Sequence, residues 1–262
     1  LVIFCLFEDF NPDEHKEESD TAGRPAWMVH VQHTTDGWLK SLPKVDKIVG
    51  PGGSFVTIAK SIISERTAID MLAGPTELGI IADATANPRY IALDLISQSE
   101  HSSDTFCFLI TNSEKLAKLV DKIITDLSNK VKRNDFVKKS LKENGFIAIC
   151  KNNSDMIKLA NELAPEHLQI MVKNPNDIAS KITSSGLILL ENDTPSSASD
   201  YLLGSNHILP TNRFGKTRGS LSVLDFVKIN TQISSSKSAL SKISKHMQVF
   251  TEAEGLPNHH EA

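Results

Sequence analysis

The stretch "LGIIADATANPRYIALDLISQSEH", residues 78–101, holds the pattern that decides the fold. Its first six residues are a short, almost continuous apolar run, which is typical of a strand buried on both faces of a parallel sheet. From Pro88 onward the apolar residues recur with a helical period. The stretch therefore predicts a strand over 78–83 and a helix over 88–101.

The same alternation continues on both sides of this stretch. Further strands are predicted at 46–50, 105–111, 145–150, 168–173 and 187–192, and further helices at 54–65, 113–129, 154–167 and 175–186. Strands that alternate with helices predict an α/β fold with right-handed crossovers. We expect a Rossmann-like parallel sheet flanked by helices, followed by a small C-terminal helical segment.

Helix starts carry their own signals. Ser113 and Ser154 each precede a run of helical period and are predicted N-caps. The segment 121–144 is rich in Lys but contains Asp and Glu throughout, so it predicts a solvated helix face.

Composition excludes several classes of protein. The 262 residues carry a formal net charge of −4, and no basic cluster indicates nucleic-acid binding. No apolar run approaches the roughly 20 residues that cross a bilayer, so we expect no membrane partner. Cys5, Cys107 and Cys150 are too scattered for a disulfide framework, which favours a reducing cytoplasm.

Ligands of open α/β sheets bind beyond the carboxyl ends of the strands, so we expect the functional site there. The polar segments that loops and helix ends could bring to it are "GPTE" (74–77), "SQSEH" (97–101), "APEHL" (164–168), "SDYLLGSNH" (199–207) and "EGLPNHH" (254–260). The long segment after Asn192 is rich in Ser, Gly, Pro and Thr, and a loop of this length is typically functional.

Two of these segments permit both a chemical and a plain interpretation. Gln98 and His101 lie three residues apart on one helix face and could hold one ligand, or they could form an ordinary solvated helix end. Glu166 and His167 could be a general-base pair or a solvated turn.

A metal site is also compatible with the residue types. His101, Asp200 and His259 offer imidazole and carboxylate ligands, and Gln98 offers an amide oxygen. Such a set suits zinc, although no compact metal-binding motif is present. "GPGG" (50–53) follows a strand and precedes a helix, so it could approach a phosphate or be a plain tight turn.

Seven motifs occur in an order that resembles the histidinol dehydrogenase family, a zinc enzyme family of histidine biosynthesis. They are "DKIVGPG", "AIDMLAGPTE", "IIADATANP", "ALDLISQSEH", "ELAPEHLQI", "SDYLLGSNHILPT" and "EAEGLPNH", within about residues 42–260. The resemblance implies oxidation of L-histidinol to L-histidine through the aldehyde, with two NAD+. It also implies a homodimer in which the C-terminal Glu and His reach the partner's site.

The resemblance implies a role for individual residues. Zinc would be held by Gln98, His101, Asp200 and His259 and would bind the substrate's imidazole and amine. His167 would accept the alcohol proton, and Glu166 would activate water. Further substrate contacts would come from Thr76, His207 and Glu254. Where the family turn reads GPGN and its Asn contacts NAD, this chain has Gly53.

The family also extends further at its N-terminus, where much of its dinucleotide-binding domain lies. We therefore expect an unrelated or disordered leader over 1–40, a remnant of the dinucleotide-binding domain over 41–67, a main zinc and substrate domain over 68–225 and a C-terminal helical segment over 226–262. Two alternatives to the dehydrogenase remain: a catalytically inactive zinc-binding or interaction remnant, and a zinc hydrolase that uses Glu166.

Overall fold

The computed structural model describes residues 3–4 and 45–262, so the predicted leader over 1–40 lies almost entirely outside the described residues. The elements in chain order are β1 (Ile3–Phe4), β2 (Lys47–Val49), α2 (Ser54–Ile63), β3 (Ala68–Ile69), β4 (Glu77–Ala82), α3 (Pro88–Ser99), β5 (Phe106–Thr111), α4 (Glu114–Ser128), α5 (Asn134–Asn144), β6 (Phe146–Ile149), α6 (Asn153–Leu163), β7 (His167–Met171), α7 (Pro175–Ala179), β8 (Leu187–Leu190), α8 (Ser196–Tyr201), α9 (Lys237–Ala253) and α10 (Asn258–Glu261), with short 3-10 helices η2 (Phe214–Lys216) and η3 (Val223–Phe226).

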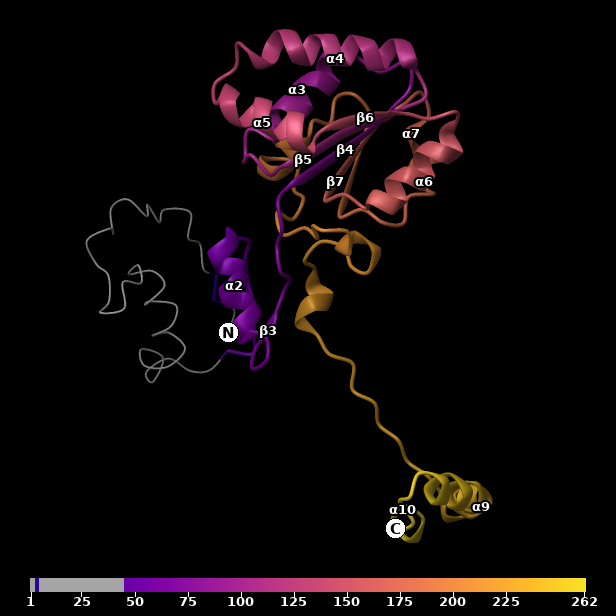
Figure 1. Ribbon diagram of the computed structural model, residues 1–262. Coiled ribbons are helices and arrows are strands. Elements are labelled where there is room, and N and C mark those ends of the chain that lie inside the picture. The colour runs from indigo at the N-terminus through magenta and orange to yellow at the C-terminus, as the bar shows by residue number, and fades with distance from the viewer. Residues whose placement is uncertain (1–2, 5–44) are drawn as a thin grey trace, which may run out of the picture. The chain divides into compact units, whose positions relative to one another are not determined.

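The predicted parallel sheet is confirmed. Its five strands follow the order β6-β5-β4-β7-β8, and every neighbouring pair is parallel. The chain adds β5 and β6 on one side of β4 and then returns to add β7 and β8 on the other (Figure 1). Strand order therefore reverses between β4 and β7, as it does in Rossmann-like sheets.

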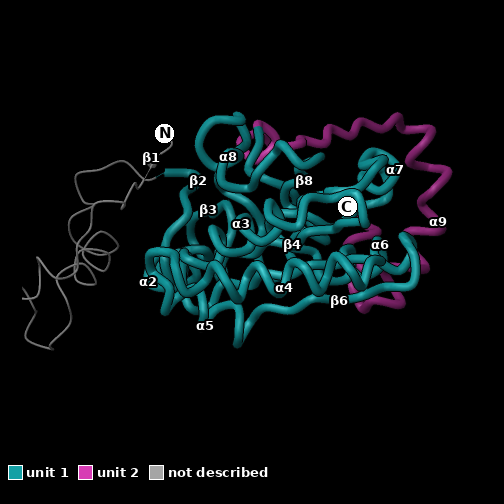
Figure 2. The backbone as a smooth tube through the Cα atoms, turned by 90° about the horizontal axis from the view of Figure 1, so that it is seen from above, with its two compact units in different colours: residues 1–222 teal, residues 223–262 magenta. Residues whose placement is uncertain are grey.

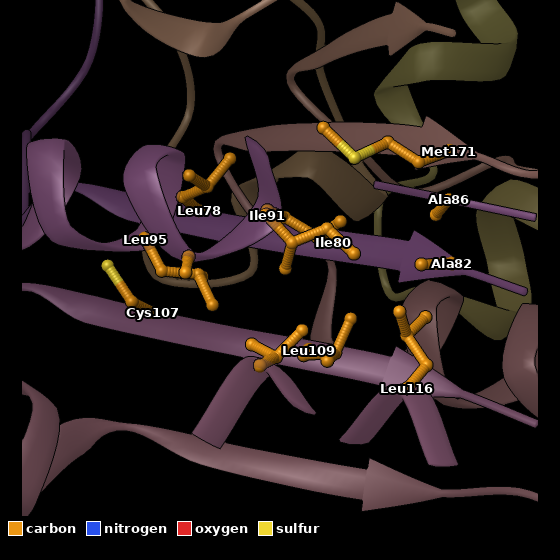
Figure 3. Packing of buried hydrophobic residues seen from close by; sticks show 12 residues of the cluster. Leu78, Ile80, Ala82, Ala86, Ile91, Leu95, Cys107, Leu109, Leu116 and Met171 are labelled. Carbon is orange, nitrogen blue, oxygen red and sulfur yellow. The ribbon is translucent and has the colours of Figure 1, made fainter. Parts of the chain in front are cut away.

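Helices cover both faces of this sheet, and β4 contributes to both cores because its side chains alternate. Leu78, Ile80 and Ala82 pack with apolar residues of α3 and α4 (Figure 3). Ile81 packs on the opposite face with residues of α6 and α7. All six residues of β4 are buried, which explains the continuous apolar run in the sequence.

The predicted helix starts have different outcomes. Ser113 is the N-cap of α4, and its side chain accepts the N–H of Leu116 at 3.2 Å, as predicted. The prediction for Ser154 is wrong, because Asn152 is the N-cap of α6 and accepts the N–H of Asp155 at 2.9 Å.

The segment 121–144 is not one continuous helix. It contains the end of α4 and all of α5, and Arg133 between them has a left-handed backbone with φ of 53°. Val137 and Ser140 are fully buried, and the hydroxyl of Ser140 donates to the carbonyl of Thr105 at 2.9 Å. One face of α5 therefore packs inward, and only the other is solvated.

A second, smaller sheet has the parallel order β1-β2-β3. The described part of the chain divides into two compact units between Ser222 and Val223 (Figure 2). The second unit contains α9 and α10, which confirms the predicted C-terminal helical segment. Among the described residues, no helix combines the length and the apolarity that crossing a membrane requires.

Candidate functional site

The candidate residues meet at the amino ends of β4 and β7, so the expectation of a site at the carboxyl ends is wrong for them. Thr76 directly precedes β4, and His167 is the first residue of β7. Helix α3 follows β4 and runs back from the carboxyl edge of the sheet. Its last turn therefore brings Gln98 to the amino edge, beside Thr76. Parallel strands and returning helices therefore bring these distant segments together.

Thr76 connects two of the candidate segments through its hydroxyl group. The hydroxyl donates to Oε2 of Glu166 at 2.7 Å and accepts from Nε2 of Gln98 at 2.7 Å. Gln98 is 2% exposed and Glu166 is 9% exposed, so both hydrogen bonds are shielded from water. This network fixes the orientation of the Glu166 carboxylate.

The imidazole of His167 has oxygen atoms near both of its ring nitrogens. Its Nδ1 is 3.3 Å from the main-chain carbonyl of Glu77 and 3.7 Å from Oε2 of Glu166, whereas its Nε2 is 3.3 Å from Oδ1 of Asp200. Asp200 comes from α8, which packs against α3. Nδ1 of His207 lies 3.6 Å from the same Asp200 oxygen.

These contacts shift the pKa values of His167 and Asp200. Burial alone would lower the pKa of His167, but the hydrogen bond to Asp200 and the charges of Glu166 and Asp200 raise it above its ordinary value. Burial would raise the pKa of Asp200, but the two imidazoles hold it well below its usual range. The arrangement thus favours a carboxylate beside a basic imidazole, which suits proton transfer.

Glu77 belongs to this site, although the sequence patterns assigned it no role. Its Oε1 accepts the N–H of Asn212 at 3.0 Å, and its Oε2 accepts the N–H of Glu166 at 3.1 Å. Burial raises the pKa of Glu77 to about 7, against the opposing effect of these two hydrogen bonds. A carboxylate that begins a fully buried strand was the signal available in the sequence.

Four other predicted residues are exposed. His101 is exposed, and its Nδ1 is 3.0 Å from the main-chain carbonyl of Gln98. Gly53 is the exposed N-cap of α2, with open space where a side chain would extend. Glu254 and His259 are exposed residues of the second unit.

The residues predicted to bind zinc offer donor atoms of suitable types. Amide oxygen, carboxylate and imidazole are a chemically suitable donor set, and Gln98, His101 and Asp200 belong to the first unit. Within residues 3–4 and 45–262, no three His, Cys, Asp or Glu side chains are grouped to hold a metal ion.

Comparison with known proteins gives a consistent result. The family model described as histidinol dehydrogenase matches residues 37–262. Histidinol dehydrogenase of Lactococcus lactis subsp. lactis is 40% identical over 220 residues, covering 84% of this chain and 51% of the relative. Histidinol dehydrogenase of Methanocaldococcus jannaschii is 41% identical over 223 residues, covering 85% and 52%.

A solved structure supports the same relationship. The crystal structure of histidinol dehydrogenase from Elizabethkingia anophelis superposes with a TM-score of 0.76 at 34% identity, covering 88% of this chain and 53% of that one. The chain spans about half the length of the curated relatives it matches. The chain belongs to the histidinol dehydrogenase family.

Proposed function

We propose that this chain carries the substrate half of a histidinol dehydrogenase, which oxidises L-histidinol to L-histidine through L-histidinal with two NAD+. The single observation that supports this most is the contact series Gln98–Thr76–Glu166–His167–Asp200. These residues come from four separate segments, and they include the proposed acid–base pair, Glu166 and His167. The family model matches most of the length of this chain.

In the first oxidation, His167 accepts the proton of the substrate's alcohol at Nε2, the ring nitrogen that faces Asp200. The carbinol hydrogen leaves as hydride to the first NAD+, and the alcohol becomes an aldehyde. The nearby Asp200 carboxylate supports this role, because it stabilises the imidazolium that forms.

In the second oxidation, Glu166 removes a proton from water as the water attacks the aldehyde. The resulting hydrate anion transfers its hydride to a second NAD+, and the carboxylic acid that forms releases its proton to solvent, which gives L-histidine. Thr76 holds Oε2 of Glu166, which leaves the other carboxylate oxygen for the water. His167 is therefore the base in the oxidation of the alcohol, and Glu166 is the base that forms the hydrate.

We assign zinc to Gln98, His101, Asp200 and His259. These residues would hold the ion, which would supply a Lewis-acid anchor for the nitrogen atoms of the substrate. Thr76, His207 and Glu254 are the proposed further substrate contacts. Because Glu254 and His259 belong to the second unit, we propose that they act in the site of a partner subunit in a homodimer.

The NAD+ site and the cellular location are also proposals. Gly53, at the start of α2, is the position of this chain that corresponds to the proposed cofactor contact. The two described cysteines, Cys107 and Cys150, are free thiols, which supports a reducing compartment such as the cytoplasm.

The test is NADH formation from L-histidinol and NAD+ by the purified chain with added zinc. The matched control is the double variant Glu166→Gln His167→Asn, which removes both proposed acid–base groups with little change in volume. Turnover that disappears in the control supports the proposal. A folded, zinc-loaded chain that binds L-histidinol without forming NADH would indicate the inactive remnant, and ester cleavage without NAD+ would indicate the hydrolase.

A further inference from the structure

Glu77 is a buried carboxylate that the proposed reaction does not use. It is 7% exposed, and the hydrogen bonds to its carboxylate come from main-chain N–H groups of two distant segments. Burying a carboxylate is costly unless its oxygens are well satisfied. The residue therefore raises the question of what its burial achieves.

The contacts of Glu77 converge on the proposed acid–base pair. Glu77 and Glu166 bond reciprocally: the N–H of Glu77 donates to Oε2 of Glu166 at 3.0 Å, and the N–H of Glu166 donates to Oε2 of Glu77 at 3.1 Å. The carbonyl of Glu77 also faces Nδ1 of His167 at 3.3 Å. One residue thus contacts both members of the pair through its main chain and its side chain.

The segments that Glu77 joins have unfavourable backbone conformations. Ala164, two residues before Glu166, has φ of 49°, while Asn212 and Arg213 have φ of 53° and 65°. Left-handed backbone at non-glycine residues is costly and persists only where surrounding contacts hold it. The two N–H groups that Glu77 accepts lie within or beside these turns, so its carboxylate is one of those contacts.

The turn at 211–213 is also fitted closely to the segment before Glu77. A Cβ on Gly74 would overlap the side-chain amide of Asn212, and the N–H of Gly74 donates to the hydroxyl of Thr211 at 2.6 Å. Displacement of Asn212 would therefore be transmitted to the loop that carries Thr76.

We infer that Glu77 is a positioning residue for Glu166 and His167: it fixes the carboxylate and the imidazole for proton transfer by tying the "APEHL" segment and the turn at 211–213 to the start of β4. This inference rests on the proposed function for its catalytic part. Its structural part, the tying of the two segments, is tested separately.

The structural test is amide hydrogen exchange in Glu77→Ala. The amides of Glu166 and Asn212 lose their acceptor, so each should exchange about tenfold faster or more, the equivalent of one hydrogen bond. Amides of the β4–β5 ladder are the internal control and should keep their protection. An equal loss of protection at the amides of the β4–β5 ladder would mean general destabilisation and would overturn the inference.

The catalytic test is steady-state kinetics of Glu77→Gln, which keeps the size of the side chain but can accept only one of the two N–H groups. We expect kcat to fall about 10-fold to 100-fold, with KM changed less than about threefold, because positioning acts on the reaction step. Asp94→Asn is the matched control, since Asp94 is another buried carboxylate of the same unit. It should keep the kcat of the unmodified chain.

The outcomes separate this inference from the proposed function. If the unmodified chain turns over and Glu77→Gln keeps kcat within about twofold, the inference is wrong while the proposed function stands. If the unmodified chain has no turnover, the proposed function fails and hydrogen exchange decides the structural part alone. Selective loss of protection at the amides of Glu166 and Asn212 in Glu77→Ala then supports the structural part, and unchanged protection contradicts it.

Discussion

Replacing Thr76 with Val should destabilise the protein without changing its packing. Val has nearly the shape of Thr but lacks the hydroxyl that joins Glu166 to Gln98. The substitution leaves the Nε2 donor of Gln98 without its acceptor and removes one donor from the Glu166 carboxylate. Thr76→Ser is the matched control, because it keeps the hydroxyl and loses only a methyl group.

The magnitude follows from the two hydrogen bonds. A bond to a charged group contributes about 1.5–3 kcal/mol, and one between neutral groups contributes about 0.5–1.5 kcal/mol. Both partners are nearly buried, so water replaces little of the loss. We expect Thr76→Val to lower the free energy of unfolding by about 3 kcal/mol, and Thr76→Ser by about 1 kcal/mol for its methyl group.

The assay is urea unfolding followed by circular dichroism, with the midpoint and the slope both recorded. An unchanged slope with a lower midpoint indicates a true loss of stability. Thr76→Val and Thr76→Ser within about 0.5 kcal/mol of one another would refute the reasoning, because the hydroxyl would then contribute no more than an ordinary surface group.

Three further substitutions test other features. Ser113→Ala should cost about 1 kcal/mol in urea unfolding, because the N–H of Leu116 loses its cap; no change would contradict the assignment. Gly79→Ala should cost about 1–3 kcal/mol in the same assay, because the added Cβ would lie 2.5 Å from the ring of Phe108; a neutral result would mean that the ring moves aside freely. Glu77→Gln should flatten the pH dependence of stability. The unfolded chain releases this proton near its ordinary pKa of 4.5 and the folded protein only at about 7, so stability falls as pH rises between them, by at most about 3 kcal/mol. Parallel pH profiles of the two proteins would contradict the assigned shift.

The sheet was predictable because its strands are buried on both faces. Burial on two faces leaves a continuous apolar run, and β4 shows this pattern throughout. The break between α4 and α5 was not predictable, because Arg133 adopts the left-handed conformation with neither Gly nor Pro beside it. The cap of α6 was misplaced by two residues, since Asn152 and Ser154 are both good N-caps and only the fold selects one.

Part of the predicted residue set forms one network, namely Thr76, Gln98, Glu166, His167 and Asp200, but its location in the fold was not predicted. Motifs pointed to Glu166 and His167, but no spacing in the sequence reveals that they lie at the amino edge of the sheet. That location depends on the return of α3, which carries Gln98 back to Thr76. Glu77 was missed because its role depends on Asn212, a partner 135 residues away along the chain.

We propose that His167 and Glu166 act as bases in successive oxidations at one site. The most direct measurement is the number of NADH molecules formed for each L-histidinol consumed by the zinc-supplied chain and two single variants. We predict two for the unmodified chain, one for Glu166→Gln with release of the aldehyde, and none for His167→Asn. Two NADH from Glu166→Gln, or turnover by His167→Asn at the unmodified rate, would contradict this division of roles.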